Sequence, residues 1–524
     1  MVDASNHPLA IPRPGDGASS DAWPLYGRVG TRVLETSASR ALGWHVPMQR
    51  AGDAVARLAL ALAPHARRIW VAAGPGNNGG DGFEAAAVLS RAGKEVTIAL
   101  ATIDGLPAEA QASLAHALAA GATLMATPRP LGLGPLDLAI DALFGIGLRS
   151  APEGWHRDAI AELNASPAPT LAVDVPSGLD GEHGSVFDPV ACVRARWTLA
   201  LLSLKPGLFT GQGRDHAGSV WFSDLGYAAG LEPAAARLSC PGAASWPSRR
   251  HAHHKGSFGD VWAVGGAAGM AGAVVLCARA ASLAGAGRVM LAPLDPAVGA
   301  FDLERPELML REVASLQSRS VRLEESTVVC GSGAGSAPWP WFASVLSRAG
   351  RLLLDADALN ALAHDPGLQA QLARRAAQGR HTILTPHPLE AARLLGTQTA
   401  AIQSDRLAAA RELAARFALV VVLKGSGTVI AAPGEPPWIN ASGNACLASA
   451  GTGDVLAGWI GGLWSQGLAA IDAARLGVHS HGAAADAWQA RRARPAALPA
   501  SALLEELGRP SKAQARPEQG PSNF

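Results

Sequence analysis

The sequence has few cysteines, no excess of charge of either sign and no long apolar run. Its five cysteines stand far apart in 524 residues and form no C-x-x-C pair. They predict buried free thiols in a reducing compartment rather than disulfides or a structural zinc site. With 44 Lys and Arg against 43 Asp and Glu, the formal net charge is +1. This balance argues against nucleic acid or an acidic membrane surface as a partner and favours a small-molecule ligand.

Targeting and membrane-spanning segments are also missing. The first residues, MVDASNHPLAIPRPGDGASSD, have neither a basic start nor an unbroken apolar core, and no later apolar run is long enough to cross a bilayer. The sequence has no Walker-type G-K-[ST], which excludes a P-loop enzyme. We therefore expect a cytoplasmic protein with no membrane contact and with a flexible segment over residues 1–22.

The first half of the chain alternates short apolar runs with helix-length amphipathic stretches. Its strand candidates are residues 68–74, 95–101, 136–145, 170–178, 197–204 and 219–226. Strands separated by helices predict a parallel, doubly wound sheet. The chain is too long for a single core, and proline, glycine, serine and histidine interrupt the pattern over 240–257. We therefore predict a first domain over 23–239, followed by a linker.

The alternation then restarts and predicts a second α/β domain over 258–508. Its strand candidates are residues 260–266, 288–294, 326–333, 351–358, 381–387, 419–425 and 428–434. The last two are close enough in sequence to form a hairpin. The polar, proline-containing tail over 509–524 is expected to be disordered.

A glycine-rich turn, GPGNNGGDGF, joins the first strand candidate to an apolar-periodic segment. Glycines there let backbone N–H groups approach a ligand, and the helix start favours an anion such as phosphate. A tight loop without a ligand would have the same glycines. Asn77, Asn78 and Asp81 favour the binding site, because a mere turn does not need their amide and carboxylate groups.

Further polar residues follow two other strand candidates of the first half. Asp141 and the pair Asp174 and Ser177 lie where open α/β sheets bind ligands. Each aspartate alone could be a helix cap or an Asx-turn residue. Together with Asn78 they supply hard oxygen ligands for a cation, or for a ribose and phosphate group. Lys205 receives little weight, because a lysine before a Pro-Gly turn is more often exposed to solvent.

The second half contains SAGTGDVLAG, which places backbone amides at a helix start. The amides of Gly451, Thr452 and Gly453 can stabilise charge on a transferring phosphoryl group. Asp454 then stands where a base could take a proton from an attacking hydroxyl, although aspartate is also a common helix cap. Nearby, Lys424–Ile430 forms a small-residue turn suited to nucleotide phosphates, and His387 lies between two prolines at a strand end. The histidines of the linker suggest only a solvated loop.

In order along the chain, these motifs resemble the bifunctional NAD(P)H-hydrate repair enzymes. PMQRAG, GPGNNGGDG, DALFGIG, VDVPSGLDG and KPGL resemble the NAD(P)H-hydrate epimerase domain. HKGSFGDVWAVGG, GMAGAVVLCARAASLAGAG, LDADALN, TPHPLEAARLL, KGSGTVI and GNACLASAGTGDVLAG resemble the NAD(P)H-hydrate dehydratase domain. The resemblance covers about Trp23 to Gly508. It implies a Rossmann-like first domain and a ribokinase-like second domain.

The resemblance also implies site residues. Substrate contacts in the epimerase domain would come from Asn77, Asn78, Gly79, Gly80, Asp81, Gly145, Ile146, Gly147, Leu148, Arg149, Ser150, Ala151 and Asp174. Asn78, Asp141 and Ser177 would surround a potassium ion. Substrate contacts in the dehydratase domain would come from Ala273, Gly333 or Gly335, His387 and Asp454. The nucleotide would lie against Lys424, Gly425, Ser426, Gly427, Thr428 and Gly453. Two departures, Gln49 for glutamate and Leu389 for glycine, carry no chemistry, but Leu389 affects the turn at His387.

The activity implied is repair of hydrated nicotinamide cofactors. The first domain would interconvert the two epimers of hydrated NADH and NADPH, with Asp174 as the best acid/base candidate. In the second, Asp454 would activate the C6 hydroxyl for phosphorylation, and loss of phosphate would restore the cofactor at the expense of ADP with Mg²⁺. Two alternatives stay open: a kinase of a small hydroxylated metabolite, and a first domain that only binds ligand. We expect a homo-oligomer.

Overall fold

The chain folds into two compact units, the first containing Trp23–Arg237 and the second starting at Leu238. The computed structural model describes residues 9–10, 22–129, 132–227, 233–241, 246–296, 302–336, 338–494 and 496–509. Most of the segment expected to be flexible, part of the expected linker and the tail from residue 510 lie outside these residues. The chain passes between the units within β2 (Ala22–Leu25) and β10 (Ala236–Ser239).

The first unit is built on a sheet with the strand order β1-β9-β8-β7-β6-β3-β4-β5. The strands are β1 (Leu9–Ala10), β3 (Arg68–Ala73), β4 (Glu95–Leu100), β5 (Thr123–Met125), β6 (Leu138–Ala142), β7 (Thr170–Val173), β8 (Trp197–Leu201) and β9 (Ser219–Ser223). All pair in parallel except β1, which pairs antiparallel with β9. Each strand predicted from the sequence of this half is present, and the parallel sheet is confirmed.

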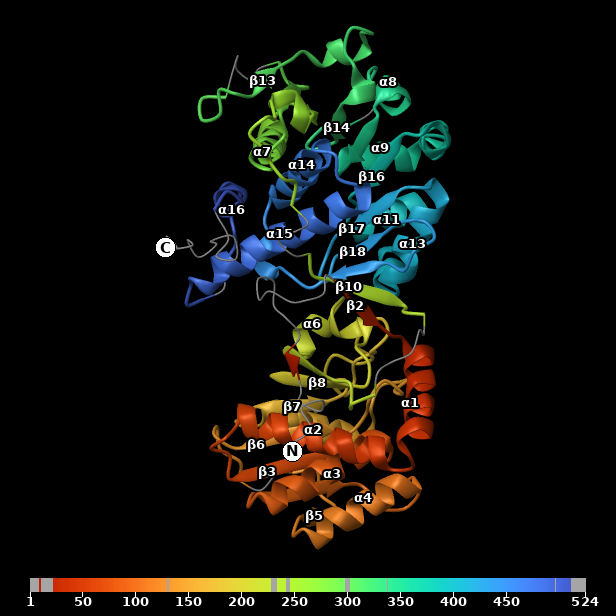
Figure 1. Cartoon of the computed structure of the whole chain (residues 1–524), viewed down its shortest axis with the longest axis vertical. Coiled ribbons are helices and arrows are strands. Elements are labelled where there is room, and N and C mark those ends of the chain that lie inside the picture. The colour runs from red at the N-terminus through yellow and green to blue at the C-terminus, as the bar shows by residue number, and fades with distance from the viewer. Residues whose placement is uncertain are drawn as a thin grey trace, which may run out of the picture. The chain divides into compact units, whose positions relative to one another are not determined.

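Helices of the first unit follow its strands and cover the sheet. They are α1 (Arg28–Leu42), α2 (Val46–Leu62), α3 (Asn77–Arg91), α4 (Ala108–Ala119), α5 (Gly154–Ala165) and α6 (Gly213–His216). Helix α3 packs between α2 and α4 (Figure 1). Gly80 of α3 lies against both neighbours, because a Cβ there would lie 2.5 Å from Met48 Sδ and 3.3 Å from Ala110 Cα. At Gly52 an added Cβ would lie 2.2 Å from the Cβ of Glu84, so glycine is what lets α2 approach α3 this closely.

The second unit is also built on a sheet that is largely parallel. From one edge, its strands run in the order β13-β12-β11-β14-β15-β16-β17-β18-β19. They are β11 (Asp260–Gly265), β12 (Arg288–Pro293), β13 (Met309–Leu310), β14 (Thr327–Cys330), β15 (Arg351–Leu354), β16 (His381–Leu384), β17 (Val420–Leu423), β18 (Val429–Ala431) and β19 (Trp438–Asn440). The predicted hairpin is confirmed, because β17 and β18 pair antiparallel. Strands β13 and β19, of two and three residues, were not predicted from the sequence.

Two helices of the second unit, α7 and α14, pack side by side and position much of its candidate site. The helices are α7 (Ala271–Leu283), α8 (Phe342–Arg348), α9 (Asp357–His364), α10 (Pro366–Ala373), α11 (Pro388–Leu395), α12 (Thr399–Ser404), α13 (Arg406–Phe417), α14 (Thr452–Ser465), α15 (Ala470–Ala490) and α16 (Ala500–Leu507). A Cβ at Gly458 of α14 would lie 1.9 Å from the carbonyl oxygen of Cys277 in α7. The backbones of the two helices are therefore in direct contact at this glycine.

Other expectations about the chain can be checked on this fold. The two-domain α/β class is confirmed. All five cysteines are free, and four of them are buried. Among the described residues, no helix combines the length and apolarity needed to cross a bilayer. The linker histidines His251, His253 and His254 are exposed, as a solvated loop requires.

Candidate active sites

The glycine-rich turn of the first unit joins β3 to α3 by a close contact between backbones. A Cβ at Gly74 would lie 1.8 Å from the carbonyl oxygen of Leu143, and one at Gly79 would lie 2.1 Å from the carbonyl oxygen of Gly74. Only glycine fits at these two positions. The turn after β3 is thereby held against the turn after β6, and the side chains of both turns meet at the carboxyl ends of the strands.

Asp141 and Ser177 form a hydrogen-bonded pair at this edge. The Ser177 hydroxyl donates to Oδ1 of Asp141 at 2.6 Å, and the Ser177 backbone N–H donates to Oδ2 at 2.8 Å. The Leu143 N–H also donates to Oδ1, at 3.2 Å. Asp141 is fully buried, and burial raises its pKa to about 6. No Lys or Arg among the described residues pairs with this carboxyl group.

Asn78 and Asp174 approach each other over Gly145. The Cβ position of Gly145 lies 3.0 Å from Oδ2 of Asp174 and 3.3 Å from Oδ1 of Asn78, so a larger residue would crowd both side chains. Asp174 has a positive φ of 67°, a strained conformation that is concentrated at functional sites. The side-chain nitrogen of Asn78 is buried and has no hydrogen-bond partner. Such an orphaned donor is expected where a ligand completes the site.

Lys205 lies in the same cluster, fully buried, although the sequence favoured an exposed lysine. Its ammonium group donates to the carboxylate of Asp174 and, at 2.8 Å each, to the carbonyl oxygens of Leu201 and Ser203. Burial and the neighbouring charge of Asp174 raise the pKa of Asp81 well above its usual value. The cluster therefore joins an ion-paired carboxylate to a second carboxyl group that favours its protonated form.

The loop over residues 145–151 borders this cluster. The N–H of Ile146 donates to Asp174 Oδ2 at 3.4 Å, and the guanidinium of Arg28 binds the Ile146 carbonyl oxygen at 3.1 Å. Gly147, Arg149 and Ser150 are exposed. Asn77 is exposed as well, whereas Gly79 and Gly80 are buried behind it. The loop thus presents exposed backbone and side chains next to the buried acid.

In the second unit, an ion pair lies at the carboxyl ends of β15 and β17. Nζ of Lys424 donates to Oδ1 of Asp355 at 2.5 Å, and the Thr385 hydroxyl donates to the same oxygen at 2.7 Å. The Lys424 ammonium is 3.8 Å from the Cβ position of Gly453 at the start of α14. A fixed cation thus lies beside the helix N-terminus whose amides the sequence suggested for phosphate.

Asp454 lies in the first turn of α14, which begins after Gly451 in the left-handed region at φ 87°. Burial, followed by the neighbouring charge of Asp355, raises the pKa of Asp454 to about 6. A carboxylate with a pKa close to neutrality is matched to general base catalysis. The structure thus gives Asp454 a more basic carboxylate than an aspartate exposed to solvent would have.

His387 begins α11 and forms a reciprocal cap with Glu390. Nδ1 of His387 accepts from the N–H of Leu389 at 3.1 Å and of Glu390 at 3.2 Å, while Glu390 Oε2 accepts from the His387 N–H at 2.7 Å. Burial and Lys424 lower the pKa of His387. Burial raises the pKa of Glu390 to about 7. The imidazole is therefore neutral at physiological pH, and its Nε2 lies 3.3 Å from Oε1 of Glu390.

The remaining predicted residues of the second unit line the neighbouring turns. A Cβ at Gly333 would lie 2.9 Å from the Cβ of Ala273, so the turn after β14 lies directly on the start of α7. The N–H of Gly335 donates to Asp357 Oδ2 at 2.9 Å. The turn after β17 is held from beneath by the buried Arg406, whose guanidinium donates to the carbonyl oxygen of Lys424 at 3.1 Å.

Comparison with known proteins places both units in families. A model described as NAD(P)H-hydrate dehydratase matches residues 261–509, and one described as YjeF-related protein N-terminus matches residues 45–207. The bifunctional NAD(P)H-hydrate repair enzyme of Escherichia coli (strain K12) is 41% identical over 453 residues, which are 85% of this chain and 85% of that protein. The chain belongs to the family of bifunctional NAD(P)H-hydrate repair enzymes.

Other members of the bifunctional NAD(P)H-hydrate repair enzymes match over a similar length. The enzyme of Coxiella burnetii is 36% identical over 84% of this chain and 89% of its own. Among solved structures, the ADP/ATP-dependent NAD(P)H-hydrate dehydratase of Bacillus subtilis, co-crystallised with ATP/Mg²⁺, is 29% identical with a TM-score of 0.41, covering 50% of this chain and 92% of that one. The prediction of an enzyme that joins an epimerase domain to a dehydratase domain is confirmed.

The two candidate sites contain residues that the sequence did not single out. Lys205 received little weight, and Asp355, Thr385 and Glu390 received none, although LDADALN and TPHPLEAARLL were among the motifs that carry the resemblance. Their position after predicted strands was a usable signal. Their burial and mutual contacts were not visible in the sequence.

Proposed function

We propose that the first unit interconverts the R and S epimers of hydrated NADH and NADPH, and that the second dehydrates the S form with ADP and Mg²⁺. One observation carries the proposal: each unit holds a partly buried aspartate, Asp174 or Asp454, beside a lysine at the carboxyl edge of its own parallel sheet. Both sites are thus built for proton transfer next to an anionic ligand, as cofactor repair requires. The five free thiols support a reducing compartment such as the cytoplasm.

Asp174 is the acid/base group in the proposed epimerase site. Lys205 holds its carboxylate in position, and the exposed loop at residues 147–150 leaves the site open to the hydrated nicotinamide. Asn78 reaches the same point with an unpartnered amide nitrogen that can donate to the substrate. In this arrangement Asp174 exchanges a proton with the substrate, while Asp81 lies close enough to be influenced by its charge.

A potassium ion fits beside this site. Asn78, Asp141 and Ser177 offer amide, carboxylate and hydroxyl oxygens, which are the donors that hard cations prefer. Asp141 is buried without a cationic partner among the described residues, and this burial raises its pKa. A bound cation would offset the free-energy cost of burying the negative charge of its carboxylate. The ion would supply fixed positive charge for the phosphates of the substrate.

In the proposed dehydratase site, Asp454 takes the proton of the C6 hydroxyl as that oxygen attacks the terminal phosphate of the nucleotide. The amides of Gly451 to Gly453 and the ammonium of Lys424 stabilise the transferred group. Phosphoryl transfer breaks the bond between the terminal phosphorus of ADP and its bridging oxygen, so the nucleotide leaves as AMP. Breakage of the C6–O bond then releases phosphate, and loss of a proton from C5 forms the C5–C6 double bond of the restored dihydronicotinamide. The turn at residues 424–428 holds the nucleotide, and Ala273, Gly333 or Gly335 and His387 contact the hydrate.

The test is a repair assay with hydrated NADH epimers, with ADP and ATP compared side by side and the restored dihydronicotinamide followed by its absorbance. Asp454→Asn should abolish dehydration but keep epimerisation, and Asp174→Ala should do the reverse. Wild-type repair by Asp454→Asn would show that the proposed base is wrong. Conversion of the R epimer by Asp174→Ala well above the spontaneous rate would exclude Asp174. A stable phosphorylated product would support the kinase alternative.

A further inference from the structure

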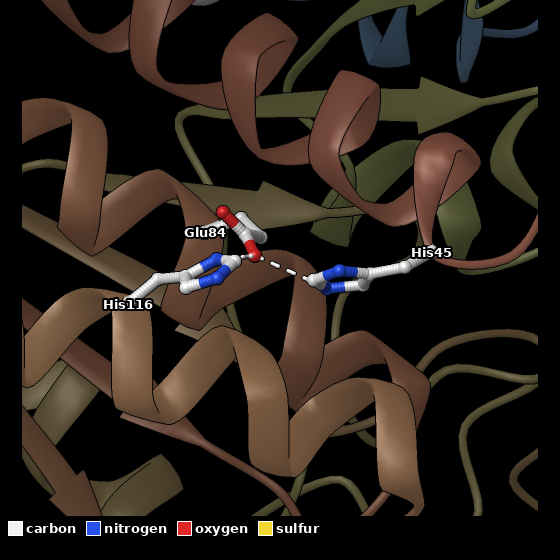
Figure 2. A group of neighbouring side chains, drawn as sticks. All are labelled: His45, Glu84 and His116. Carbon is white, nitrogen blue, oxygen red and sulfur yellow. Dashed lines mark hydrogen bonds and ion pairs between the residues drawn. The ribbon is translucent and has the colours of Figure 1, made fainter.

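Two histidines and a glutamate, none of them assigned to the epimerase site, meet in the first unit. His45 precedes α2, Glu84 lies in the middle of α3, and His116 lies in the last turn of α4. Figure 2 shows the two imidazole rings on either side of the Glu84 carboxylate, pointing toward it from different helices. No motif in the sequence predicted this cluster, because its members are separated by 39 and 32 positions.

The three side chains lie close enough together to share one metal ion. Oε1 of Glu84 lies 2.8 Å from Nδ1 of His116 and 3.2 Å from Nε2 of His45. All three ligand atoms lie within 4.8 Å of one another. Two atoms bound tetrahedrally to Zn²⁺ at about 2.1 Å are about 3.4 Å apart. Small rotations of the side chains would therefore bring all three atoms to one ion.

The cluster places a carboxylate in a buried position, where its charge needs a partner. The side chains of Glu84 and His45 are only 6% and 5% exposed. The ion-pair partners of Glu84 among the described residues are the two imidazoles, with no Lys or Arg beside them. A buried carboxylate is rarely left without a full positive charge. A divalent cation bound by neutral imidazoles would provide one.

The surrounding structure already orients the ligands. Glu84 is fixed against Gly52 of α2, where there is no room for a side chain. His45 adopts φ 67°, and its N–H donates to Glu109 Oε1 at 3.2 Å. Its Nε2 is 2.8 Å from the Ser113 hydroxyl, a hydrogen bond that a bound metal ion would replace. The His116 side chain is 42% exposed, which provides an entry route and space for a water ligand. Secondary contacts of this kind are what hold metal ligands in position.

We propose that His45, Glu84 and His116 bind a divalent transition metal of the zinc class. The ligands are Nε2 of His45, Oε1 of Glu84 and Nδ1 of His116, and the fourth position is open to water. Two imidazoles and a carboxylate select Zn²⁺ and similar ions over Mg²⁺ or K⁺. The ion ties α2 and α4 to α3, the helix whose first turn carries Asn78 and Asp81. Its role is therefore to support the substrate turn rather than to take part in the reaction.

The experiment uses the full-length protein, treated with EDTA and dialysed, with ZnCl₂ as the probe. Calorimetric titration measures affinity and stoichiometry, and differential scanning calorimetry measures the Zn²⁺-dependent rise in Tm. Loss of an outer partner of a metal ligand typically costs 10–100-fold in affinity, so loss of a ligand should cost at least about 100-fold. His116→Ala should show this loss and no rise in Tm. Glu84→Gln, which keeps the shape of the side chain, should behave alike.

The controls separate this site from chance binding. His65→Ala removes an exposed histidine of the same unit and should leave Zn²⁺ affinity unchanged. Replacing the linker histidines His251, His253 and His254 by alanine should also leave it unchanged. Unaltered Zn²⁺ binding in His116→Ala, or loss of binding in the linker variant alone, would overturn the proposal. So would a wild-type protein that binds no Zn²⁺, because the cluster would then be a hydrogen-bonded network only.

Discussion

Replacing Lys205 by methionine tests whether the buried ion pair with Asp174 organises the epimerase site. Methionine has nearly the length of lysine without its charge, so the packing is largely retained. The change leaves the Asp174 carboxylate, which is 13% exposed, without its counter-charge and removes one hydrogen-bond donor from each of the carbonyl oxygens of Leu201 and Ser203. Breaking a buried ion pair by removing one partner costs about 3–5 kcal/mol.

The expected effect is a lower Tm for the first unit. A loss of 1 kcal/mol lowers the Tm of a domain of this size by about 2–4 °C, so the transition should fall by about 6–20 °C. Differential scanning calorimetry of the full-length protein measures this, since two units can melt separately. Epimerisation assayed below the lowered transition should also be impaired.

A matched lysine and a second variant control the interpretation. Lys94 is half-buried and donates only to the carbonyl oxygens of Pro64 and Ala66, so Lys94→Met should cost about 1 kcal/mol at most. Adding Asp174→Asn to Lys205→Met should recover part of the lost stability, because no uncompensated charge remains. A Tm decrease no larger than that of Lys94→Met, or no recovery in the double variant, would refute the reasoning.

Three further outcomes are expected. The dehydration rate should fall as the pH decreases through about 6, because Asp454 must be ionised to accept a proton and burial raises its pKa to that value; a flat profile from pH 5 to 8 in a pH–rate measurement would contradict this role. Folding raises the pKa of Asp141 to about 6, so ionising its buried carboxyl group costs the folded state more free energy as the pH rises through that value. A bound K⁺ would offset this cost, so K⁺ should increase the Tm more at pH 8 than at pH 5. Equal Tm shifts at the two pH values would argue against the cation site. Gly458→Ala should destabilise the second unit by about 1–3 kcal/mol or more, because the added methyl group would lie 1.9 Å from the Cys277 carbonyl oxygen. Gly272→Ala on α7 is the control: it has open space around it and should be neutral or slightly stabilising in the same thermal scan.

The positions of most strands and of their ends were within reach of the sequence, but their order in the sheets was not. Alternation of apolar runs and amphipathic stretches predicted a parallel sheet in the first half and an α/β domain in the second, and the placement of Asn78, Asp141 and Asp174 after strands predicted a common edge. The short strands β13 and β19 were not predicted, because two or three residues show no measurable periodicity of apolar side chains. The glycines of GPGNNGGDGF were recognised as a turn, but the backbone contact that requires Gly74 was not visible.

The sequence by itself therefore determined the class of each unit and placed most of the candidate site residues at strand ends. These depend on neighbours a few residues apart, whose periodicity is legible locally. Only the tertiary structure decided which charges meet. It buried Lys205 against Asp174, 31 positions away, and Lys424 against Asp355, 69 positions away. It also gathered His45, Glu84 and His116 between three helices. Such partners are selected by helix packing and by the free-energy cost of burying charge, which no local pattern records.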